Sequence, residues 1–355
     1  SYAAAISGGG TVNAKNCYFS DHSSASNYGG VTGDSTVTAT NCTFENNSTG
    51  VAFSATWVVS DCLFINNYSE AMGGVAYGGY WSVKNSEFIG NYTSSTSNSI
   101  QFGGGVALGD TWIVENCKFS DNYSKQGGVF SGGYHGGNVT AIDSVFENNR
   151  AVRTVGYNNS YGGVSLNCDF TAINCIFDNN SSTDAAGVAN GRNFTAINCV
   201  FVNNSASWGG VFASLTLELV NSTLALNGND NSTSGIAHAV SGNIFNSIIY
   251  NNLGTTLFNA CNLKNTTDTT PLPNGNFLYN IIEGGINAFN SIDPQSSYYF
   301  NESFILDSDP LFFDINDPDG LDETWGTVDD GLRLNSNSPA IGKGSDEYLP
   351  NDTYD

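Results

Sequence analysis

The stretch Asn174-Cys175-Ile176-Phe177-Asp178-Asn179-Asn180 is the clearest copy of a unit that recurs along most of the chain. Nine further copies align on the position of Cys175, and we call this position the anchor column. Successive anchors lie 20 to 31 residues apart. A repeat of this period predicts a solenoid, so the fold has to be argued from the repeat. The anchors are Cys17, Cys42, Cys62, Ser86, Cys117, Ser144, Cys175, Cys199, Ser222 and Ser247.

The residues before each anchor alternate between apolar and mixed side chains. The position five residues before the anchor is apolar in nine of the ten copies, and the position three before it is mostly small and apolar. In the copy quoted above, these residues are Phe170 and Ala172. Alternation with a period of two predicts a strand with one buried face. The first of these positions also holds three tryptophans, which we therefore expect in the core: Trp57, Trp81 and Trp112.

The residue directly before the anchor is Asn or Asp in all ten copies. Beyond it the alternation changes phase, and the anchor and the residue two places on become the regular inward face. Because Asn and Asp tolerate left-handed backbone, the phase change predicts a corner at which the chain enters a second sheet. We expect these side chains to stack as one ladder, the corner ladder: Asn16, Asn41, Asp61, Asn85, Asn116, Asp143, Asn174, Asn198, Asn221 and Asn246.

A second asparagine column and a glycine turn complete the unit. Asparagine recurs five residues after the anchor, from Asn47 to Asn252, and Gly127-Gly128-Val129 or a close variant follows. Such a turn opens another short strand. Three strands and three corners predict one coil of a parallel β-helix, and parallel crossovers are right-handed. We expect an all-β, right-handed parallel β-helix solenoid of about ten coils or more over residues 1–255. Residues 256–355 should form terminal degenerate coils and an irregular, acidic C-terminal cap.

Six of the eight cysteines occupy the anchor column, where they interchange with serine. The interchange indicates that a small inward side chain is required at this position. Equivalent side chains in stacked parallel strands point side by side, which is poor geometry for a disulfide. We therefore expect buried free thiols. The spacing of cysteines and histidines does not predict a zinc site.

The chain is strongly acidic, with 33 Asp and Glu against 10 Lys and Arg and a net charge of −23. This balance argues against binding to nucleic acid or to an anionic membrane surface, since both require a basic patch. The sequence contains no run of 18 apolar residues, so we expect no membrane span in this chain. The composition suits an extracellular or cell-surface protein. We expect the chain to start after processing or inside a longer protein.

Three copies of Asn-Tyr-Ser/Thr have the form of an N-glycosylation acceptor. An Asn/Ser/Thr-rich chain also produces such triplets by chance, and the sequence leaves both interpretations open. The triplets are Asn67-Tyr68-Ser69, Asn91-Tyr92-Thr93 and Asn122-Tyr123-Ser124.

The strongest candidate site is the acidic stretch Asp317-Pro318-Asp319-Gly320-Leu321-Asp322 with the pair that follows it. Oxygen ligands at alternate positions around a glycine turn suit Ca²⁺. The spacing is not that of an EF-hand, because no glutamate stands at the twelfth place. Five carboxylates within 14 residues repel one another without a cation. We expect Ca²⁺ as a cofactor, and the alternative is a solvated acidic turn. The expected metal ligands are Asp317, Asp319, Asp322, Asp329 and Asp330.

Residues for catalysis are sparse. The chain has four arginines and six lysines, and its three histidines, His22, His135 and His238, are scattered. A hydrolase of this fold needs clustered carboxylate pairs, yet Asp61 and Asp143 merely replace Asn in a structural column. No constellation of nucleophile, base and oxyanion donor emerges from the sequence. We expect that the protein is not an enzyme.

The C-terminal residues and the repeat unit resemble parts of known surface proteins. Asp309-Pro310-Leu311-Phe312, Leu332-Arg333-Leu334 and Ser338-Pro339-Ala340-Ile341 resemble the ending of bacterial surface β-helix proteins of the choice-of-anchor type. The Gly-Gly-Val and Phe-x-Asn-Asn units resemble repeats of chlamydial polymorphic outer-membrane proteins and of adhesin-like proteins of methanogens. The resemblance implies a secreted or surface-attached β-helix, and segments similar to the acidic stretch look like calcium loops there. It implies no particular ligand.

We therefore expect an extracellular adhesin-like or surface structural module that binds a glycan or a ligand on a host or neighbouring cell. One alternative is a secreted polysaccharide lyase or hydrolase of β-helix fold. A basic residue facing paired carboxylates across adjacent coils would distinguish it. Another alternative is a subunit of an extracellular filament or sheath, which would self-associate through open coil ends.

Overall fold

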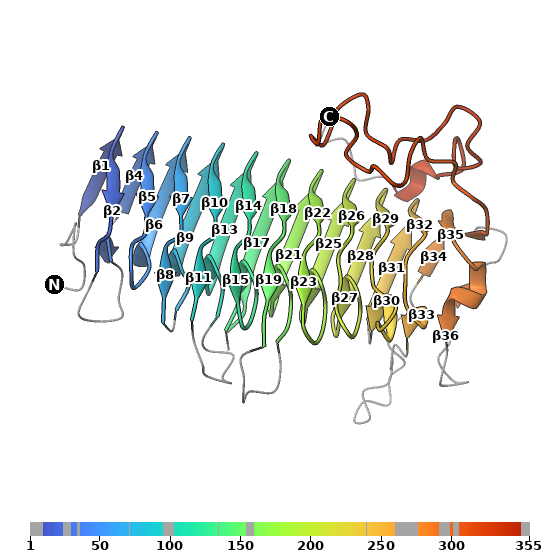
Figure 1. Ribbon diagram of the computed structural model, residues 1–355, viewed down its shortest axis with the longest axis horizontal. Helices are drawn as coiled ribbons and strands as arrows, with labels where there is room; N and C mark the ends of the chain where they lie inside the picture. The colour runs from blue at the N-terminus through green and yellow to red at the C-terminus, as the bar shows by residue number, and fades with distance from the viewer. Residues whose placement is uncertain are drawn as a thin grey trace.

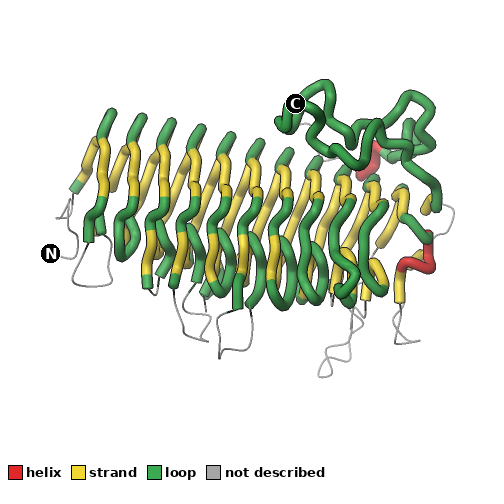
Figure 2. Tube along the Cα trace, viewed as in Figure 1, coloured by secondary structure: helices red, strands yellow, loops and turns green. Residues whose placement is uncertain are grey.

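The computed structural model describes residues 10–23, 30–33, 36–70, 72–94, 103–133, 135–153, 160–238, 240–259, 276–290, 299–300 and 305–348. This part of the chain is all-β, with long parallel sheets and two short 3-10 helices, η1 (Gly285–Ala288) and η3 (Asp346–Tyr348). The strands stand in rows that repeat along one long axis (Figures 1 and 2). The arrangement is compatible with the parallel β-helix that the repeat predicts.

The first and widest sheet contains the strands that precede each anchor and those that follow each glycine turn. The strands before the anchors are β1 (Thr11–Lys15), β4 (Thr36–Thr40), β6 (Ala52–Ser60), β9 (Ala76–Lys84), β13 (Asp110–Glu115), β17 (Gly137–Ile142), β21 (Cys168–Ile173), β25 (Asn193–Ile197), β28 (Thr216–Val220), β31 (Ser241–Phe245), β34 (Asn276–Leu278) and β37 (Tyr299–Phe300). The others are β3 (Thr32–Gly33), β12 (Ala107–Leu108), β16 (Phe130–Ser131), β20 (Ser165–Leu166), β24 (Ala189–Asn190), β27 (Phe212–Ala213), β30 (Ser234–His238), β33 (Thr256–Asn259) and β36 (Phe289–Asn290).

The second sheet contains the strands that begin just after each anchor, and the third contains the strands after the second asparagine column. The second sheet comprises β2 (Tyr18–Ser20), β5 (Thr43–Glu45), β7 (Leu63–Ile65), β10 (Glu87–Ile89), β14 (Lys118–Ser120), β18 (Val145–Glu147), β22 (Ile176–Asp178), β26 (Val200–Val202), β29 (Thr223–Ala225), β32 (Ile248–Tyr250), β35 (Asn280–Ile282) and β38 (Ile305–Leu306). The third comprises β8 (Tyr68–Ser69), β11 (Tyr92–Thr93), β15 (Tyr123–Ser124), β19 (Arg150–Ala151) and β23 (Ser181–Ser182).

The register between repeats is the one that the anchor column predicts. Phe177 pairs in parallel with Phe146 of the preceding repeat and with Phe201 of the following one. The second sheet continues past residue 255, because β35 pairs with β32 and β38 pairs with β35. Two further repeats, with Asn280 and Ile305 at the anchor position, therefore extend the stack beyond the last clear copy of the motif.

The corner ladder is confirmed. Its ten Asn and Asp residues have φ angles between 48° and 55°, the left-handed conformation that these residues tolerate. At five steps of the ladder the side-chain amide of one repeat donates to the side-chain oxygen of the preceding one over 2.8 to 3.2 Å, as Asn41 does to Asn16. The backbone keeps its own bonds through the corner, since Asn16 N donates to Thr40 O at 3.0 Å. The side chains therefore add to the backbone bonds at this corner and do not replace them.

The second asparagine column forms a buried ladder, and its role is larger than the sequence indicated. Asn149 is 0% exposed. Its Nδ2 donates to Phe119 O at 2.9 Å and to Asn180 Oδ1 at 3.0 Å. Its Oδ1 accepts from N and Nδ2 of Asn122 at 3.1 and 3.0 Å. Every polar atom of the amide is thus paired with the repeats above and below. The members of the buried ladder are Asn47, Asn67, Asn91, Asn122, Asn149, Asn180, Asn204, Asn227 and Asn252.

The buried ladder also decides between the two interpretations of the Asn-Tyr-Ser/Thr triplets. Asn67, Asn91 and Asn122 are 0% exposed, and each donates both amide hydrogens within the ladder. A glycan on Nδ2 would remove a donor and require space that the interior lacks. The folded chain cannot accept glycans at these three positions, so the triplets follow from the repeat.

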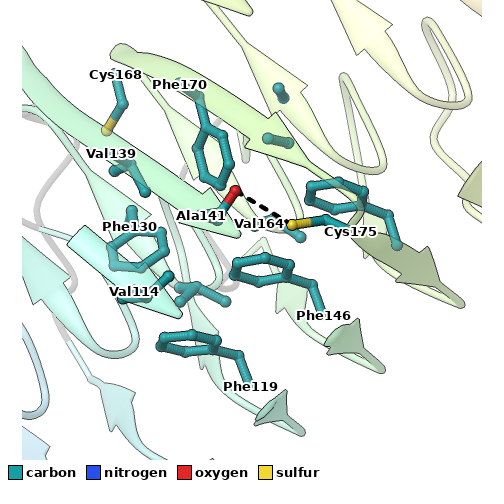
Figure 3. Close-up of a cluster of buried hydrophobic side chains, with 14 of the residues drawn as sticks. Val114, Phe119, Phe130, Val139, Ala141, Phe146, Val164, Cys168, Phe170 and Cys175 are labelled. Carbon is teal, nitrogen blue, oxygen red and sulfur yellow. Dashed lines mark hydrogen bonds between the residues drawn. The ribbon is translucent and has the colours of Figure 1, made fainter. Parts of the chain in front are cut away.

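Aromatic rings stack along the interior in the same register. Phenylalanines two places after the anchor, from Phe19 to Phe201, stack with centroids 4.6 to 5.0 Å apart, close to the spacing of neighbouring strands. Figure 3 shows Phe119 and Phe146 in this column, with Phe170 directed towards it. The prediction that Trp57, Trp81 and Trp112 lie in the core is confirmed, since none is more than 1% exposed.

The anchor cysteines are buried except Cys17, which is partly exposed, and all seven described cysteines are free. Cys175 Sγ donates to Ile173 O at 3.2 Å and lies 3.4 Å from Ala141 O, the contact drawn in Figure 3. Ser144 Oγ makes the equivalent bond to Ile142 O. Ser144 Oγ also accepts from Cys117 N, as Cys199 Sγ accepts from Cys175 N. Thiol and hydroxyl thus fill one bonding role, which explains their interchange. Cys261 lies outside the described residues.

The turn that precedes Val164 and its equivalents requires glycine because the repeats approach closely there. A Cβ on Gly163 would lie 2.0 Å from Gly187 O, and one on Gly187 would lie 2.2 Å from Gly210 O. The second glycine of the Gly-Gly-Val unit is therefore fixed by contact between successive backbones.

Residues 307–348, named here the tail, are irregular as expected, but they do not simply shield the last repeat. The tail runs back over the second sheet towards β22 (Figure 1). Ser345 N donates to Asn246 Oδ1, and Asn246 Nδ2 donates to Ser345 O, both at 2.9 Å. Val202 and Ala225 point outward, because Phe201 and Leu224 beside them point inward, yet both are 0% exposed. The tail covers this outer apolar face.

Replacing Asn149 by Ala tests the buried ladder. The change leaves Phe119 O and Asn122 N without their partners inside the stack, so we expect a loss of roughly 3 kcal/mol or more in the free energy of unfolding. Thr140, which lies on the outward face of the same repeat, provides the control, and Thr140→Ala should change stability by less than about 0.5 kcal/mol. Chemical denaturation measures both values. Equal effects of the two substitutions would contradict a structural role for the ladder.

Candidate functional site

The acidic stretch forms an exposed loop of the tail, in which three of the five predicted ligands converge. Thr327 Oγ1 lies 2.6 Å from Asp329 Oδ1, 3.3 Å from Asp330 Oδ1 and 3.4 Å from Asp322 Oδ1. A hydroxyl has one hydrogen, so it satisfies only one of the three carboxylates at a time. The loop therefore gathers negative charge around a single neutral group.

Backbone amides hold these carboxylates in place. Asp330 accepts from Gly326 N at 2.9 Å and from Thr327 N at 3.1 Å, and Asp329 accepts from Asp322 N at 3.2 Å. The Thr327 hydroxyl bond is the main reason that the pKa of Asp329 lies below its ordinary value. We had expected neighbouring carboxylates to raise one another's pKa. At Asp329, hydrogen bonds to the charged form outweigh the desolvation that raises the pKa.

The other two predicted ligands are placed differently. The backbone of Asp317 joins the loop, since Gly320 N donates to Asp317 O at 3.2 Å. Asp319 faces the second sheet, where its charge contributes to raising the pKa of Asp178. Among the residues that the structure describes, no group of three or more His, Cys, Asp or Glu side chains is arranged to hold a metal ion. The five carboxylates of the predicted site are thus divided between two environments.

Asp178 is a residue that sequence reasoning missed. It lies on β22 beneath the tail, accepts from Asn203 Nδ2 at 3.1 Å and is also hydrogen-bonded by the Trp325 side chain. Burial raises its pKa above the ordinary 3.8, and the charge of Asp319 adds to this. The signal in the sequence was indirect, because the outward positions near it, such as Ile176 and Val202, are apolar where earlier repeats have Lys118 or Glu45.

A second row of side chains lies on the outer face of the third sheet. Tyr68 and Tyr92 stack with centroids 5.3 Å apart, and Tyr92 and Tyr123 stack at 4.8 Å. The Arg150 guanidinium lies 5.9 Å from the Tyr123 ring centroid. We call these four residues the tyrosine row. The rings face one another, so the row presents ring edges and phenolic hydroxyls outward rather than aromatic faces.

The tyrosine row could be inferred from the Asn-Tyr-Ser/Thr triplets once the buried ladder is known. Asn67, Asn91 and Asn122 point inward, so the tyrosine that follows each one must point outward in the same register. The aromatic residues that the sequence places at the glycine turns, such as Tyr77 and Tyr161, belong to the first sheet and its turns instead.

Two arginine–aspartate pairs cross adjacent repeats. Arg192 donates to Asp169 through Nε at 3.1 Å and Nη2 at 2.8 Å, and its hydrogen bonds hold the pKa of Asp169 below the ordinary value. Arg153 pairs with Asp184, which also accepts from Ser160 N at 2.7 Å. Each guanidinium meets one carboxylate. A lyase site would place a base opposite paired carboxylates, and neither pair has that form.

No protein-family model matches the chain, and neither a curated protein nor a solved structure matches it. The family resemblances drawn from the tail and the repeat unit therefore stay predictions. Within the described ranges, no helix is both long and apolar enough to cross a membrane.

The raised pKa of Asp178 predicts a pH dependence of stability. The folded chain binds this proton more tightly than the unfolded chain, so the stabilisation from the neutral acid is full below about pH 3.8 and is lost as pH rises through the raised pKa. Asp178→Asn keeps the shape without the charge. We expect it to raise the melting temperature at pH 7 by a few degrees and to reduce the loss of stability above pH 4.

Asp169→Asn provides the matched control with the opposite sign. The pKa of Asp169 is lowered, mainly by hydrogen bonds from Arg192, so the charged form stabilises the fold at neutral pH and the effect is lost as pH falls. This substitution should lower the melting temperature at pH 7. A lower melting temperature at pH 7 for Asp178→Asn as well would show that the buried charge is not costly.

Proposed function

We propose that the chain is a right-handed parallel β-helix that acts outside the cell as an adhesin-like or structural surface module, without catalysis. The in-register pairing of successive repeats supports the helix, and right-handed coiling is the rule for parallel crossovers. The net charge of −23 supports a protein that stays soluble outside the cell. The buried ladder makes the stack stiff, which suits a scaffold for display.

The tyrosine row is the main observation that supports a binding function. Its outward edge offers three phenolic hydroxyls and one guanidinium in fixed positions, spaced by the repeat. Such a row fits a ligand with its own regular hydrogen-bonding groups, and a polysaccharide chain has them. Because the aromatic faces are already in contact with one another, recognition would use hydrogen bonds instead of ring stacking. Arg150 adds a site for a carboxylate or sulfate at one end.

Immobilised cellulose, chitin, mannan, pectate and alginate provide the test. We expect the chain to retain at least one of these polymers without shortening it, and Tyr92→Ala to weaken that binding about tenfold, because Tyr92 contacts both neighbours of the row. Tyr18→Ala is the control, since Tyr18 is 63% exposed on the second sheet. Loss of binding in the Tyr18 variant alone would contradict the proposal, as would the release of unsaturated fragments.

We also propose that Ca²⁺ binds the acidic loop, with Asp322, Asp329 and Asp330 as its first carboxylate ligands. Their convergence on the Thr327 hydroxyl supports this, because a cation would neutralise charge that one hydroxyl cannot. Of the other two predicted ligands, Asp317 joins the loop through its backbone and Asp319 faces Asp178. Ca²⁺ would stabilise the loop and thereby the tail on the second sheet.

Chelation should lower the melting temperature, since a ligand at a hundredfold excess over its Kd stabilises the folded state by about 2.7 kcal/mol. Asp329→Asn should abolish the difference between calcium-loaded and chelated samples. Asp346→Asn, an exposed acid of the same tail, should leave the difference intact. If chelation does not change the melting curve and elemental analysis finds no calcium, the acidic loop is a solvated turn.

Self-association through coil ends stays a prediction. The residues that precede β1 and those that follow the tail, residues 1–9 and 349–355, lie outside the described part of the chain.

A further inference from the structure

A cavity of about 530 Å³ lies between the tail and the outer face of the second sheet. Its volume is within the range of small-molecule sites, which is about 300 to 1,000 Å³. The sheet side is formed near the Asn246 corner by residues of β32, β35 and β38, and the tail forms the opposite side. The residues that matter for the chemistry are Ile248, Ile281, Leu306, Leu334, Ala340 and Lys343.

Hydrogen bonds attach the tail to the sheet at one side of the cavity and join two segments of the tail to each other at the other. On one side Ser345 and Asn246 exchange two hydrogen bonds of 2.9 Å. On the other, Asn335 Nδ2 donates to Phe312 O at 3.1 Å, and Leu334 forms an antiparallel bridge with Phe312. The cavity is thus built from two fixed walls of one chain.

The polar groups of the sheet wall are already satisfied within the protein. Asn280 Oδ1 accepts from Ser247 N at 2.8 Å, and Asn280 Nδ2 donates to Ile244 O at 2.8 Å. Ser247 Oγ donates to Phe245 O at 2.8 Å. What remains for a ligand on this wall is aliphatic surface, from Ile248 and Ile281. The body of a fitting ligand is therefore apolar.

The one charged residue in the lining is a cation. Lys343 is exposed, and none of the ion pairs among the described residues involves it. Two carboxylates beside these strands, Glu283 and Asp307, accept hydrogen bonds from the backbone amides of Asn251 and Gly284. An unpaired lysine beside an apolar cavity, in a chain with net charge −23, favours a ligand with one negative group.

We propose that this cavity binds a small aliphatic carboxylate, with its chain against Ile248, Ile281 and Leu334 and its carboxylate at Lys343. The site is independent of the tyrosine row and of the acidic loop, since it shares no residue with either. It would make the fit of the tail on the second sheet depend on the ligand, because both walls contact the same molecule.

Calorimetric titration of the full chain with octanoate tests the proposal, and 1-octanol and octylamine are the matched probes of the same chain length. We expect saturable binding of octanoate with one site per chain. Octanol should bind about fivefold more weakly, the effect of one exposed ion pair of about 1 kcal/mol, and octylamine more weakly still. Lys343→Gln should lower the affinity for octanoate to that for octanol and leave octanol unchanged.

Ala340→Phe should obstruct the cavity and weaken the binding of both octanoate and octanol. Lys84→Gln is the control for surface charge, because Lys84 lies on the first sheet and pairs with Glu115. Circular dichroism establishes whether each variant is folded. If Ala340→Phe does not fold, the affinity of Lys343→Gln for octanoate still tests the proposal. The absence of saturable octanoate binding would overturn the proposal, and so would binding that is equal in the parent chain and in Lys343→Gln.

Discussion

The buried asparagine ladder is the interaction on which the rest of the structure depends. A stack of parallel strands has a thin interior, and the bend at the second asparagine column has backbone groups, such as Phe119 O and Asn122 N, that pair with a side chain. At this bend, one asparagine side chain in each repeat hydrogen-bonds these backbone groups and also bonds the asparagine of the next repeat. Asn149 binds Phe119 O behind it and Asn180 ahead of it, and the same pattern repeats from Asn47 to Asn252. An unpaired polar group at such depth would cost about 1 to 3 kcal/mol.

This constraint orders the neighbouring columns. With the asparagine pointing inward, the residue after it points outward, which places the half-buried Tyr68, Tyr92 and Tyr123 in one outward-facing row. The residue before it takes the left-handed conformation, as Asn148 and Asn179 do with φ of 56° and 50°. The tyrosine row and the Asn-Tyr-Ser/Thr triplets are thus consequences of one buried amide per repeat. The glycan acceptor motif and the candidate binding surface share this origin.

The repeated part of the fold could be predicted from the sequence because each position carries one physical requirement. The anchor must be small, the corner must tolerate left-handed backbone, and Phe177 must fill the interior, so their spacing set the register correctly. The tail could not be placed in this way, since it has no repeat to align. The sequence signal for the surface on which it packs is the set of apolar outward residues Ile176, Val200 and Val202. The acidic loop was located, but the orientation of Asp319 towards Asp178 depends on that docking.

The central claim is that each repeat adds one layer to a stack, and distances between equivalent outward positions test it most directly. Thr38, Thr140 and Glu218 occupy the same column of the first sheet, and Thr140 lies four repeats from Thr38 while Glu218 lies seven. Spin labels on noncanonical residues at these positions leave the cysteines untouched. Pulsed dipolar spectroscopy should give about 19 Å for the first pair and about 34 Å for the second, at about 4.8 Å per layer. Distances that do not increase in the ratio of four to seven would contradict the stack.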